Sequence, residues 1–454
     1  MHGGMGQGHT VRLLGVLLIG LFILITIHCS NSPQIRSKYI VKRKRRADHE
    51  LPQYKKRKRQ QWTPLKNSLG PELFRTHHRV SEELFNKIHE KIKKHIHTKE
   101  KYVRKTCCTG DVAHVDSRAR LSMTLKHLGG SRTCDIASFH GVSRQTVGDA
   151  IRQTLHAIKI EYPIAPFPFD DEDKLQKLAD GFKEKSTAGL FDSVVGALDG
   201  FLLRVNKRSI GNKSGCGDPS KYYCRKKYYA LNCQVCCDAN RKITSLSLRS
   251  PGAVPDTLAH MKSELHWGIA SGKLPARFHF IGDGAYPRSE QMTTPYNRTE
   301  LRRDVGGGFD NFNFYLSQLR INIECCFGML VNKFPILQSA LKTPLLSTAV
   351  DTFYVCCIVH NLCIDERLTN NVNERYSFPP GKRYTQVARV MSQILRSQKD
   401  FEYIPLVDEV TAHEFTGCRG TQVDVEDAED ATLSRREKLV RKIARLGYVR
   451  PRRT

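Results

Sequence analysis

The sequence predicts an α/β fold in which a mixed sheet flanked by helices follows a smaller helical region. Between about residues 81 and 160, apolar residues recur at helical spacing. Between about residues 193 and 281 they form short runs separated by turn residues, as strands do. The chain has 454 residues, 40% of them hydrophobic, which is enough for two to three structural units with real cores.

The helical region is predicted to contain a helix-turn-helix. One helix starts at Ser81 and a second covers about Arg118–Leu128. A turn at Gly141 and a cap at Ser143 then lead into a helix with one apolar face, formed by Val147, Ile151, Leu155 and Ile158. This helix would expose side chains suited to phosphates and base edges in a major groove: Arg144, Gln145, Thr146 and Arg152. A plain helical hairpin packed on the core is the alternative.

The second half of the prediction is the sheet. After a proline-rich linker over Pro163–Asp171 and a helix over Glu172–Glu184, strands are expected over Ser193–Val205, Tyr222–Asp238, Lys242–Leu248 and Phe278–Ile281. Helices are expected over Asp256–Trp267, Phe314–Leu330 and Thr348–Cys363. Three strands, a helix, a fourth strand and further helices are the order of an RNase H-like catalytic core.

These elements divide the chain into six predicted segments. They are an apolar segment over 1–30, a basic disordered arm over 31–64, the helix-turn-helix region over 65–162, a linker and helix over 163–190, the RNase H-like domain over 191–366, and an irregular tail over 367–454. The tail is acidic over Asp424–Asp430 and basic over Arg435–Arg453, where a solvated tail is expected and an amphipathic helix through Leu439, Ile443 and Leu446 is the alternative.

The charge of the chain favours nucleic acid as a partner. Lys and Arg outnumber Asp and Glu by 73 to 45, which gives a formal charge of +28. Such a charge is usually neutralised by a polyanion or an anionic membrane, and clustered Lys and Arg gain affinity for nucleic acid by counterion release. A generally basic protein without such a partner is the alternative.

The N-terminal residues carry two conflicting signals about location. Basic clusters at Lys42–Arg46 and Lys55–Arg59 look like a bipartite nuclear import signal. The apolar stretch over residues 11–29 is either a signal anchor or absent from the working protein. The sequence therefore predicts a nuclear protein, with a membrane-anchored protein as the alternative if residues 11–29 are retained.

The fifteen cysteines predict a reducing compartment rather than a disulfide framework. Their number is odd, and several form adjacent pairs inside apolar runs, as small buried hydrophobes do. Cys233 and Cys236 form a C-x-x-C, which suggests zinc as an alternative. No second pair stands at ligand spacing.

Three acids are the candidate catalytic residues. Asp199 and Asp283 each end an apolar strand, and Glu324 lies on a helix between apolar residues. Cleavage of a phosphodiester by two metal ions needs carboxylates from different elements to converge on ions about 4 Å apart. Such oxygen ligands suit Mg²⁺. A turn-forming role is the alternative for each strand-terminal Asp taken alone.

An ordered series of motifs resembles the Harbinger (PIF-type) transposase family, including the domesticated nuclease that vertebrates keep from it. The resemblance runs from about Leu73 to Ile364. The motifs that carry it are Val195–Gly200, Tyr223–Asn232, Ser250-Pro251-Gly252 with Asp256, Gly282-Asp283 with Tyr286-Pro287, Arg320–Leu330 and His360–Ile364.

The resemblance implies a function for these motifs. In the family, the acids that match Asp199, Asp283 and Glu324 form the DDE catalytic triad, and Asp256 matches a further acid that helps to hold the metals. It implies hydrolysis of a DNA strand with Mg²⁺ or Mn²⁺, attack of the freed 3′-OH on target DNA, and a separate Myb-like partner protein. Basic residues near the site would hold DNA: Arg225, Lys226, Lys227, Arg302 and Arg303.

The chain departs from the family pattern beside two of the acids. Phe201 and Leu202 stand where Thr and His are usual, and Gly284-Ala285 stands where Ser-Gly is common. Neither change removes a carboxylate. The leading hypothesis is therefore a metal-dependent nuclease or transposase, and the alternative is a transposase-derived DNA-binding protein that does not cut. The sequence leaves the DNA target and the oligomeric state open.

Overall fold

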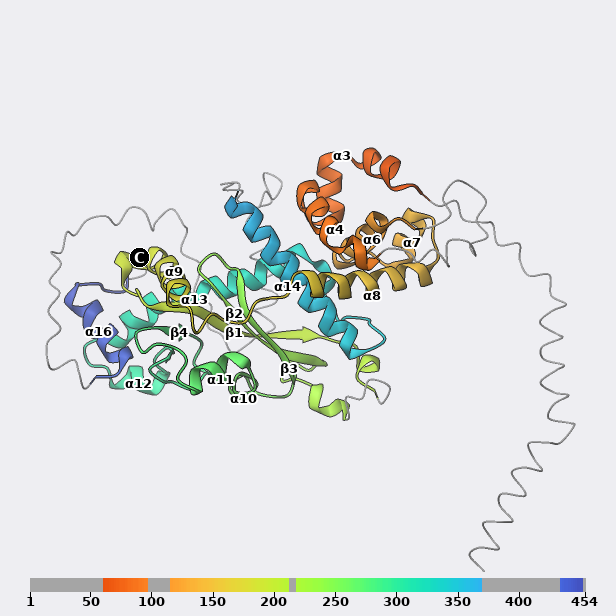
Figure 1. Ribbon diagram of the computed structural model, residues 1–454. Coiled ribbons are helices and arrows are strands. Elements are labelled where there is room, and N and C mark those ends of the chain that lie inside the picture. Colours follow the sequence, from red (N-terminus) through yellow and green to blue (C-terminus); the bar gives the residue numbers. More distant parts are fainter. Residues whose placement is uncertain (1–59, 97–114, 212–217, 370–432, 452–454) are drawn as a thin grey trace, which may run out of the picture. The chain divides into compact units, whose positions relative to one another are not determined.

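The computed structural model describes residues 60–96, 115–211, 218–369 and 433–451 (Figure 1). All of them belong to one compact unit that begins at Lys58. The apolar segment over 1–30, the basic clusters and the acidic stretch Asp424–Asp430 lie outside the described residues.

Five helices form the N-terminal region: α3 (Trp62–His78), α4 (Glu82–Ile96), α6 (Ser117–Leu128), α7 (Thr133–His140) and α8 (Arg144–Glu161). The helix α3 was not predicted, because Gly70 and Pro71 interrupt its pattern with a kink in which Gly70 has φ of 64°. Trp62 is buried and stacks on Phe85, with 5.1 Å between the ring centroids. The predicted boundary of the disordered arm at residue 64 is therefore wrong by a few residues.

The corner between α7 and α8 has the predicted local geometry. Gly141 ends α7 in the left-handed region, with φ of 63°, where a glycine is favoured. The Ser143 hydroxyl accepts a hydrogen bond from the Thr146 N–H at 3.1 Å and so caps α8. The predicted apolar face of α8 is buried against its neighbours α4 and α6.

The α/β core contains a mixed five-stranded sheet, as predicted. Its strands are β1 (Val194–Arg204), β2 (Ala230–Cys237), β3 (Ile243–Pro251), β4 (His279–Ile281) and β5 (Met292–Thr293), in the order β3-β2-β1-β4-β5. The strands β1, β2 and β3 are antiparallel neighbours, whereas β4 runs parallel to both β1 and β5. The central strand β1 therefore changes the sheet from antiparallel to parallel.

Helices cover both faces of the sheet (Figure 1). They are α9 (Glu172–Lys185), α10 (Asp256–Met261), α11 (Glu264–Ala270), α12 (Arg298–Arg303), α13 (Gly308–Lys333), α14 (Leu346–Thr369) and α16 (Arg435–Arg445), with 3-10 turns η1 (Thr187–Gly189), η2 (Lys207–Ser209), η4 (Pro219–Tyr222) and η5 (Pro335–Gln338). Buried side chains of α13 and α14 form one core cluster with Ala197 and Cys233. A second cluster joins α9 and α11 to Leu198 and Cys236. Alternate strand residues thus face two different cores.

Two predicted elements differ in the structure. The first half of the strand expected over Tyr222–Asp238 is a tight turn instead, in which Cys224 N–H donates to Tyr228 O at 2.9 Å and Lys227 has φ of 62°. The helix expected over Asp256–Trp267 is two short helices, because Ser263 caps a new one. The strand β5 and the helix α12 were not predicted, since both are too short to show a periodicity.

The prediction of an irregular tail is wrong for residues 433–451. The helix α16 packs on α13, and Arg436, which is 5% exposed, lies 3.1 Å above the ring of Tyr296. The same guanidinium is paired with Glu300 at 2.8 Å. An arginine buried this way belongs to the core, so the C-terminal segment is part of the folded domain.

The predicted long apolar helix is present as α14 and continues past residue 366 to Thr369. Among the described residues it is the helix whose length and composition would also suit a membrane span, and 67% of its most apolar window is buried inside the fold. Burial in the protein core accounts for its apolar sequence.

Candidate active site

The sheet brings Asp199 and Asp283 together. The parallel strands β1 and β4 pair Ala197 with Ile281, and each acid lies two residues further along its strand. Because side chains alternate between the two faces, both acids lie on the face of Ala197 and Ile281, which holds the α13–α14 core cluster. Asp283 therefore lies just beyond the end of β4, beside Asp199. The expectation that Asp199 ends its strand is wrong, because β1 continues to Arg204 and pairs there with β2.

Glu324 reaches the same face from α13. This helix packs on β1, and Phe327, almost one turn beyond Glu324, contacts Phe201 of β1 with 5.2 Å between ring centroids. Phe201 also stacks on Phe353 of α14 at 5.1 Å. The aromatic ring that departs from the family pattern thus helps to fix α13 and α14 on the strand that carries Asp199.

The electrostatics of the three acids show that they are near one another. The pKa of Asp199 is raised to about 7, first by burial and then by the charge of Asp283, while Arg320 lowers it and Glu324 adds a smaller rise. Burial likewise raises the pKa of Glu324, Asp283 adds to this, and Arg320 opposes it. Like charges that are held together and desolvated disfavour ionisation, which is the situation of carboxylates built to receive a cation.

Arg320 is a cation among these acids that the sequence reasoning did not single out. Its guanidinium lies 4.0 Å from Glu324, one helical turn away, and the side chain is 16% exposed. The signal was available, because residues four apart on a helix are neighbours. Arg320 partly neutralises the acids, and its buried Nε has no hydrogen-bond partner.

The donor chemistry of the three acids fits a hard divalent cation. They offer only carboxylate oxygens, the ligands that Mg²⁺ and Mn²⁺ prefer. Within the described ranges, however, no three His, Cys, Asp or Glu side chains are close enough together to hold a metal ion. The three acids are thus within electrostatic reach of one another without forming a ligand cage.

Asp256, the fourth predicted metal ligand, lies on the other side of the sheet. Its Oδ1 accepts hydrogen bonds from Asn232 Nδ2 at 2.8 Å and Gln234 Nε2 at 3.2 Å. A Cβ atom added to Gly200 would clash with this oxygen. Gly200 follows Asp199 on the strand and faces the opposite way, so Asp256 is not on the face that holds Asp199.

The predicted basic residues differ in exposure. Arg225 and Lys227 are exposed on the turn before β2, and Arg302 and Arg303 are exposed on α12. Lys226 is half-buried, and its pKa is lowered by burial and by Arg225 while Asp199 raises it. Of these residues, Lys226 is thus the one whose charge acts on the acid site.

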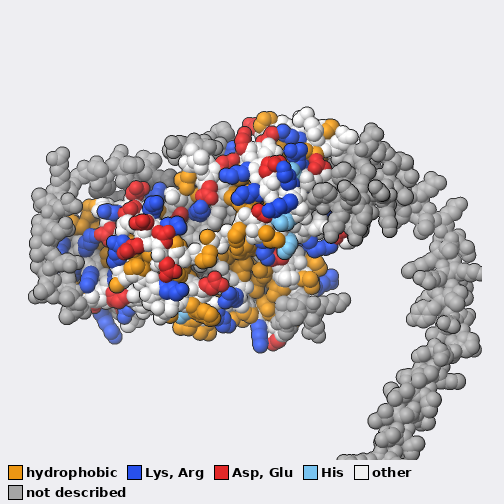
Figure 2. All heavy atoms as spheres, viewed as in Figure 1, with side chains coloured by type: hydrophobic (Ala, Val, Ile, Leu, Met, Phe, Trp, Pro, Cys, Tyr) orange, Lys and Arg blue, Asp and Glu red, His pale blue; other side chains and the backbone are white. Residues whose placement is uncertain are grey.

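The predicted DNA-binding side chains of α8 are mostly at the surface. Arg144, Gln145 and Arg152 are exposed, whereas Thr146 is half-buried, with its hydroxyl 2.9 Å from that of Ser143. The expectation that Thr146 is exposed is therefore wrong. Asp149 accepts a hydrogen bond from Gln145 at 3.1 Å and pairs with Arg152. Figure 2 shows Lys and Arg spread over the visible face rather than gathered in one patch.

The zinc alternative has no support in the sheet. Cys233 and Cys236 belong to the two different core clusters, so their sulfur atoms lie on opposite faces of β2. One metal ion cannot be bound by both. Burial raises the pKa of Cys236 to about 12, so this thiol stays protonated.

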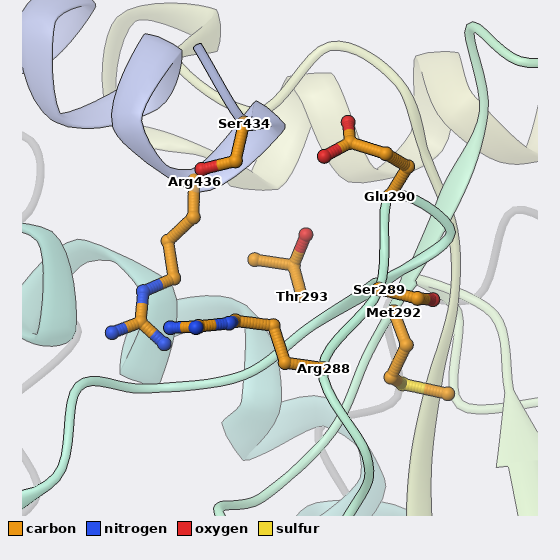
Figure 3. A pocket seen from close by; sticks show the side chains of 7 residues that line it. All are labelled: Arg288, Ser289, Glu290, Met292, Thr293, Ser434 and Arg436. Atoms are coloured by element: carbon orange, nitrogen blue, oxygen red, sulfur yellow. The ribbon is translucent and has the colours of Figure 1, made fainter.

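A small cavity of about 220 Å³ lies away from the three acids (Figure 3). Its lining comes from the segment around β5 and from the start of α16: Arg288, Ser289, Glu290, Met292, Thr293, Ser434 and Arg436. None of the candidate catalytic acids lines it. Asp199 instead lies on the central strand β1, and Asp283 lies just beyond the neighbouring strand β4.

Comparison with known proteins identifies the region that contains the acids. Residues 198–361 match the family model described as a DDE superfamily endonuclease. A protein of Bos taurus named "Putative nuclease HARBI1" is 22% identical over 219 residues, which are 47% of this chain and 58% of that protein. Residues 198–361 thus resemble a DDE endonuclease domain, and the similarity to the Bos taurus protein supports a relationship to the Harbinger family.

The predicted resemblance is thereby confirmed. The matched region includes all three acids and Asp256, and its mixed α/β architecture is consistent with a DDE nuclease fold. The chain spans 58% of the length of the curated relative, and no solved structure matches. The regions before residue 198 and after residue 361, including the helical region and α16, lie outside the matched family model.

Proposed function

We propose that this protein is a metal-dependent DNA endonuclease that hydrolyses a phosphodiester bond as transposases do, with an RNase H-like core and a catalytic triad of Asp199, Asp283 and Glu324. The observation that carries the proposal is the placement of the acids. Asp199 of the central strand β1, Asp283 just beyond β4 and Glu324 of α13 lie close enough that Asp283 helps to raise the pKa values of Asp199 and Glu324, inside the region that matches an endonuclease family model.

The three carboxylates would hold the divalent metal. When bound, Mg²⁺ or Mn²⁺ would supply the Lewis acidity that activates a water molecule and stabilises charge on the phosphate. Carboxylates bind a metal in their ionised form, so metal binding by Asp199, whose pKa is raised to about 7, would release a proton. Lys226 and Arg320 supply positive charge that can orient a phosphodiester beside the acids.

The helix-turn-helix would hold the DNA away from the cut. Arg144, Gln145 and Arg152 are exposed at the start and on the outer face of α8, where a recognition helix contacts a major groove, and Thr146 stands beside them. Arg225 and Lys227 would add phosphate contacts close to the acids.

Nicking of a supercoiled plasmid tests the proposal. The full chain is the right sample, because Trp62 and α16 pack into the core and a shorter fragment would expose them. We expect nicking with Mg²⁺ or Mn²⁺ and none with EDTA. Asp199→Asn and Glu324→Gln should each abolish it, while Asp192→Asn, an exposed acid just before β1, should not.

The alternative function is a transposase-derived DNA-binding protein that does not cut. The departure at Phe201 and Leu202 supports it, because two apolar side chains replace the polar residues usual beside the first acid, and Phe201 packs against the core. If the chain binds duplex DNA but never nicks it, even with Mn²⁺ and a Myb-like partner protein present, the alternative becomes the better account.

The place of action follows from the same proposal. A DNA endonuclease with two basic clusters before residue 60 is expected in the nucleus. The alternative is a membrane-anchored protein that retains residues 11–29. Imaging of the chain fused to a fluorescent protein, with and without residues 1–30, distinguishes the two. A membrane signal that depends on residues 1–30 contradicts the nuclear assignment.

A further inference from the structure

We propose that Asp256 is a positioning residue rather than a metal ligand. From the face opposite the acids it holds a network of side-chain hydrogen bonds that fixes β1 at Gly200 and the segment after β4, and so sets the separation of Asp199 and Asp283. The proposal rests on the proposed function only where it speaks of metal binding; the network itself is independent of it.

The first part of the network joins α10 to β2. Asp256 Oδ1 accepts from both Asn232 Nδ2 and Gln234 Nε2, and Asn232 Nδ2 also donates to Val254 O at 2.9 Å. Asn232 and Gln234 are 3% and 4% exposed. Two amides buried this deeply are destabilising unless they are hydrogen bonded, and Asp256 is an acceptor that both share.

The second part joins β2 to the segment after Asp283. The Tyr286 hydroxyl donates to Gln234 Oε1 at 2.7 Å, and Gln234 Nε2 donates to Asn232 Oδ1 at 2.8 Å. Tyr286 is 4% exposed and lies three residues after Asp283. A fixed Tyr286 limits the positions that Asp283 can take.

A direct link also joins α10 to this segment. The Thr257 hydroxyl donates to Ala285 O, and Ala285 N–H donates to Asp283 Oδ1 at 2.9 Å. The residue that follows Asp256 is therefore connected to Asp283 through the two hydrogen-bonding groups of Ala285.

Gly200 provides the contact with β1. Its missing side chain leaves the space that Asp256 Oδ1 occupies, and Gln234 Nε2 would lie 3.1 Å from a Cβ there. Gly200 pairs with Gln234 across the β1–β2 ladder and is bonded through its N–H to Asp199 Oδ1 at 2.7 Å. The network thus touches the residue that directly follows Asp199 and holds it from behind.

The same contacts make Asp256 unsuited as a ligand for a metal shared with Asp199. One of its carboxylate oxygens is already used by two amide donors, and it lies behind the strand. Outer groups of this kind orient the ligands of a metal site, and their loss typically costs about 10–100-fold in affinity or activity.

Mn²⁺ binding to the metal-free full chain is the first test, measured by electron paramagnetic resonance of the free ion. We expect Asp199→Asn to weaken Mn²⁺ binding by more than about tenfold. Asp256→Asn, which keeps an oxygen for both amides, should bind Mn²⁺ within about threefold of the wild type and nick DNA at a similar rate. The matched control is Glu264→Gln, an exposed acid in the first turn of α11. A loss with Asp256→Asn as large as with Asp199→Asn would overturn the proposal.

Asp256→Ala should behave differently from Asp256→Asn. It leaves both amides without their shared acceptor, so we expect kcat for nicking to fall about 10–100-fold while KM for DNA stays the same. Recovery of the rate by the conservative Asn variant is the signature of positioning. Equal loss in the Ala and Asn variants would show that the charge itself is required.

A double-mutant cycle without metal tests the network by itself. Gly200→Ala should lower the urea midpoint of unfolding strongly in the wild type and much less in Asp256→Ala, where the clash is gone. If Gly200→Ala does not fold alone, its recovery by Asp256→Ala is the same test, and Tyr286→Phe gives a milder partner for Asp256→Ala. Additive effects in both pairs overturn the proposed contacts. Should the wild type neither bind Mn²⁺ nor nick DNA, the proposed function fails while this cycle still decides the network.

Discussion

The two faces of the sheet around Asp199 and Gly200 of β1 hold their acidic side chains in different environments. On one face Asp199, Asp283 and Glu324 repel one another, and burial raises the pKa values of Asp199 and Glu324. On the other face Asp256 accepts two amide hydrogen bonds, within a network in which Asn232, Gln234 and Tyr286 are buried. Asp256 therefore lies on the opposite side of β1 from the three acids.

This difference indicates which face of the sheet is the candidate metal-binding face. Mutual repulsion among desolvated acids destabilises the metal-free fold, and Arg320, Lys226 and the backbone N–H groups of Gly200 and Ala285 offset it only in part. A fully satisfied network stabilises the fold and needs no further group. Binding of a cation would therefore stabilise the face with the three acids, and the hydrogen-bond network on the other face holds that site in position.

Asp199→Asn should have the largest effect and opposite signs for activity and stability. Nicking is expected to fall on the order of a thousandfold, equivalent to about 4 kcal/mol of transition-state stabilisation. The metal-free protein should become more stable, because the substitution removes a charge that Asp283 and Glu324 repel. Plasmid nicking and thermal unfolding in EDTA measure the two effects. A variant that loses both activity and stability would place Asp199 in the supporting structure instead.

Arg436→Ala should distinguish a buried arginine that stabilises the fold from Arg320, which lies beside the acids and partly neutralises them. Arg436 stacks on Tyr296 and pairs with Glu300, so its loss should cost about 2–3 kcal/mol of the free energy of unfolding. Urea unfolding measures this cost. Arg441→Ala, an exposed arginine on the same helix, is the control and should change stability by less than about 0.5 kcal/mol. Equal stability of both variants would mean that α16 contributes little to the core.

Much of the face that carries Asp199, Asp283 and Glu324 could be predicted from the sequence, whereas the opposite face with Asp256 could not. Asp199 and Asp283 each follow a strand with a strong apolar signal, and Glu324 interrupts an apolar helix face, so periodicity alone identified all three. The function of Asp256 depends on which face it approaches, and that is set by its contact with Gly200, far away in the sequence. Asn232 and Gln234 did give a signal, since they alternate within an otherwise apolar strand.

The C-terminal helix shows the same limit in another way. Its charged sequence predicted a solvated tail, because Arg435 and Arg436 are rarely buried. Tertiary partners reversed this outcome: Arg435 donates to the carbonyl oxygens of Ala276, Arg277 and Glu290, and Arg436 finds an aromatic ring and a carboxylate. Partners that lie more than 100 residues away leave no trace in local periodicity.

The stability of the metal-free protein should depend on pH because of the titration of Asp199. Burial and Asp283 raise the pKa of Asp199 from an ordinary 3.8 to about 7, so the folded chain holds a proton there that the unfolded chain releases. The resulting stabilisation is present below about pH 4 and is lost as the pH rises through 7. We expect the free energy of unfolding in EDTA to fall by roughly 1–2 kcal/mol from pH 5 to pH 8.

Two comparisons test this assignment of the pH dependence. Asp199→Asn should flatten the profile, whereas Asp256→Asn should leave its slope unchanged, since the pH dependence belongs to one face only. Mn²⁺ should stabilise the wild type more at pH 8 than at pH 5, because metal ligands must be ionised. A slope that survives in Asp199→Asn would assign the titration to another group.

The smallest effect is expected in the helical region, which the matched family model does not cover. Arg144→Ala with Arg152→Ala should weaken binding to duplex DNA several-fold and reduce the slope of log K against log salt by about 1–2, as expected for one or two lost phosphate contacts. Fluorescence anisotropy at several salt concentrations measures this. Arg152 is paired with Asp149, so Asp149→Asn should strengthen binding slightly by freeing it. Arg249→Ala, at an exposed arginine of β3, is the matched control. If the double variant binds and responds to salt as the wild type does, α7 and α8 are a packed hairpin, and the exposed basic residues near the acid site must hold the DNA.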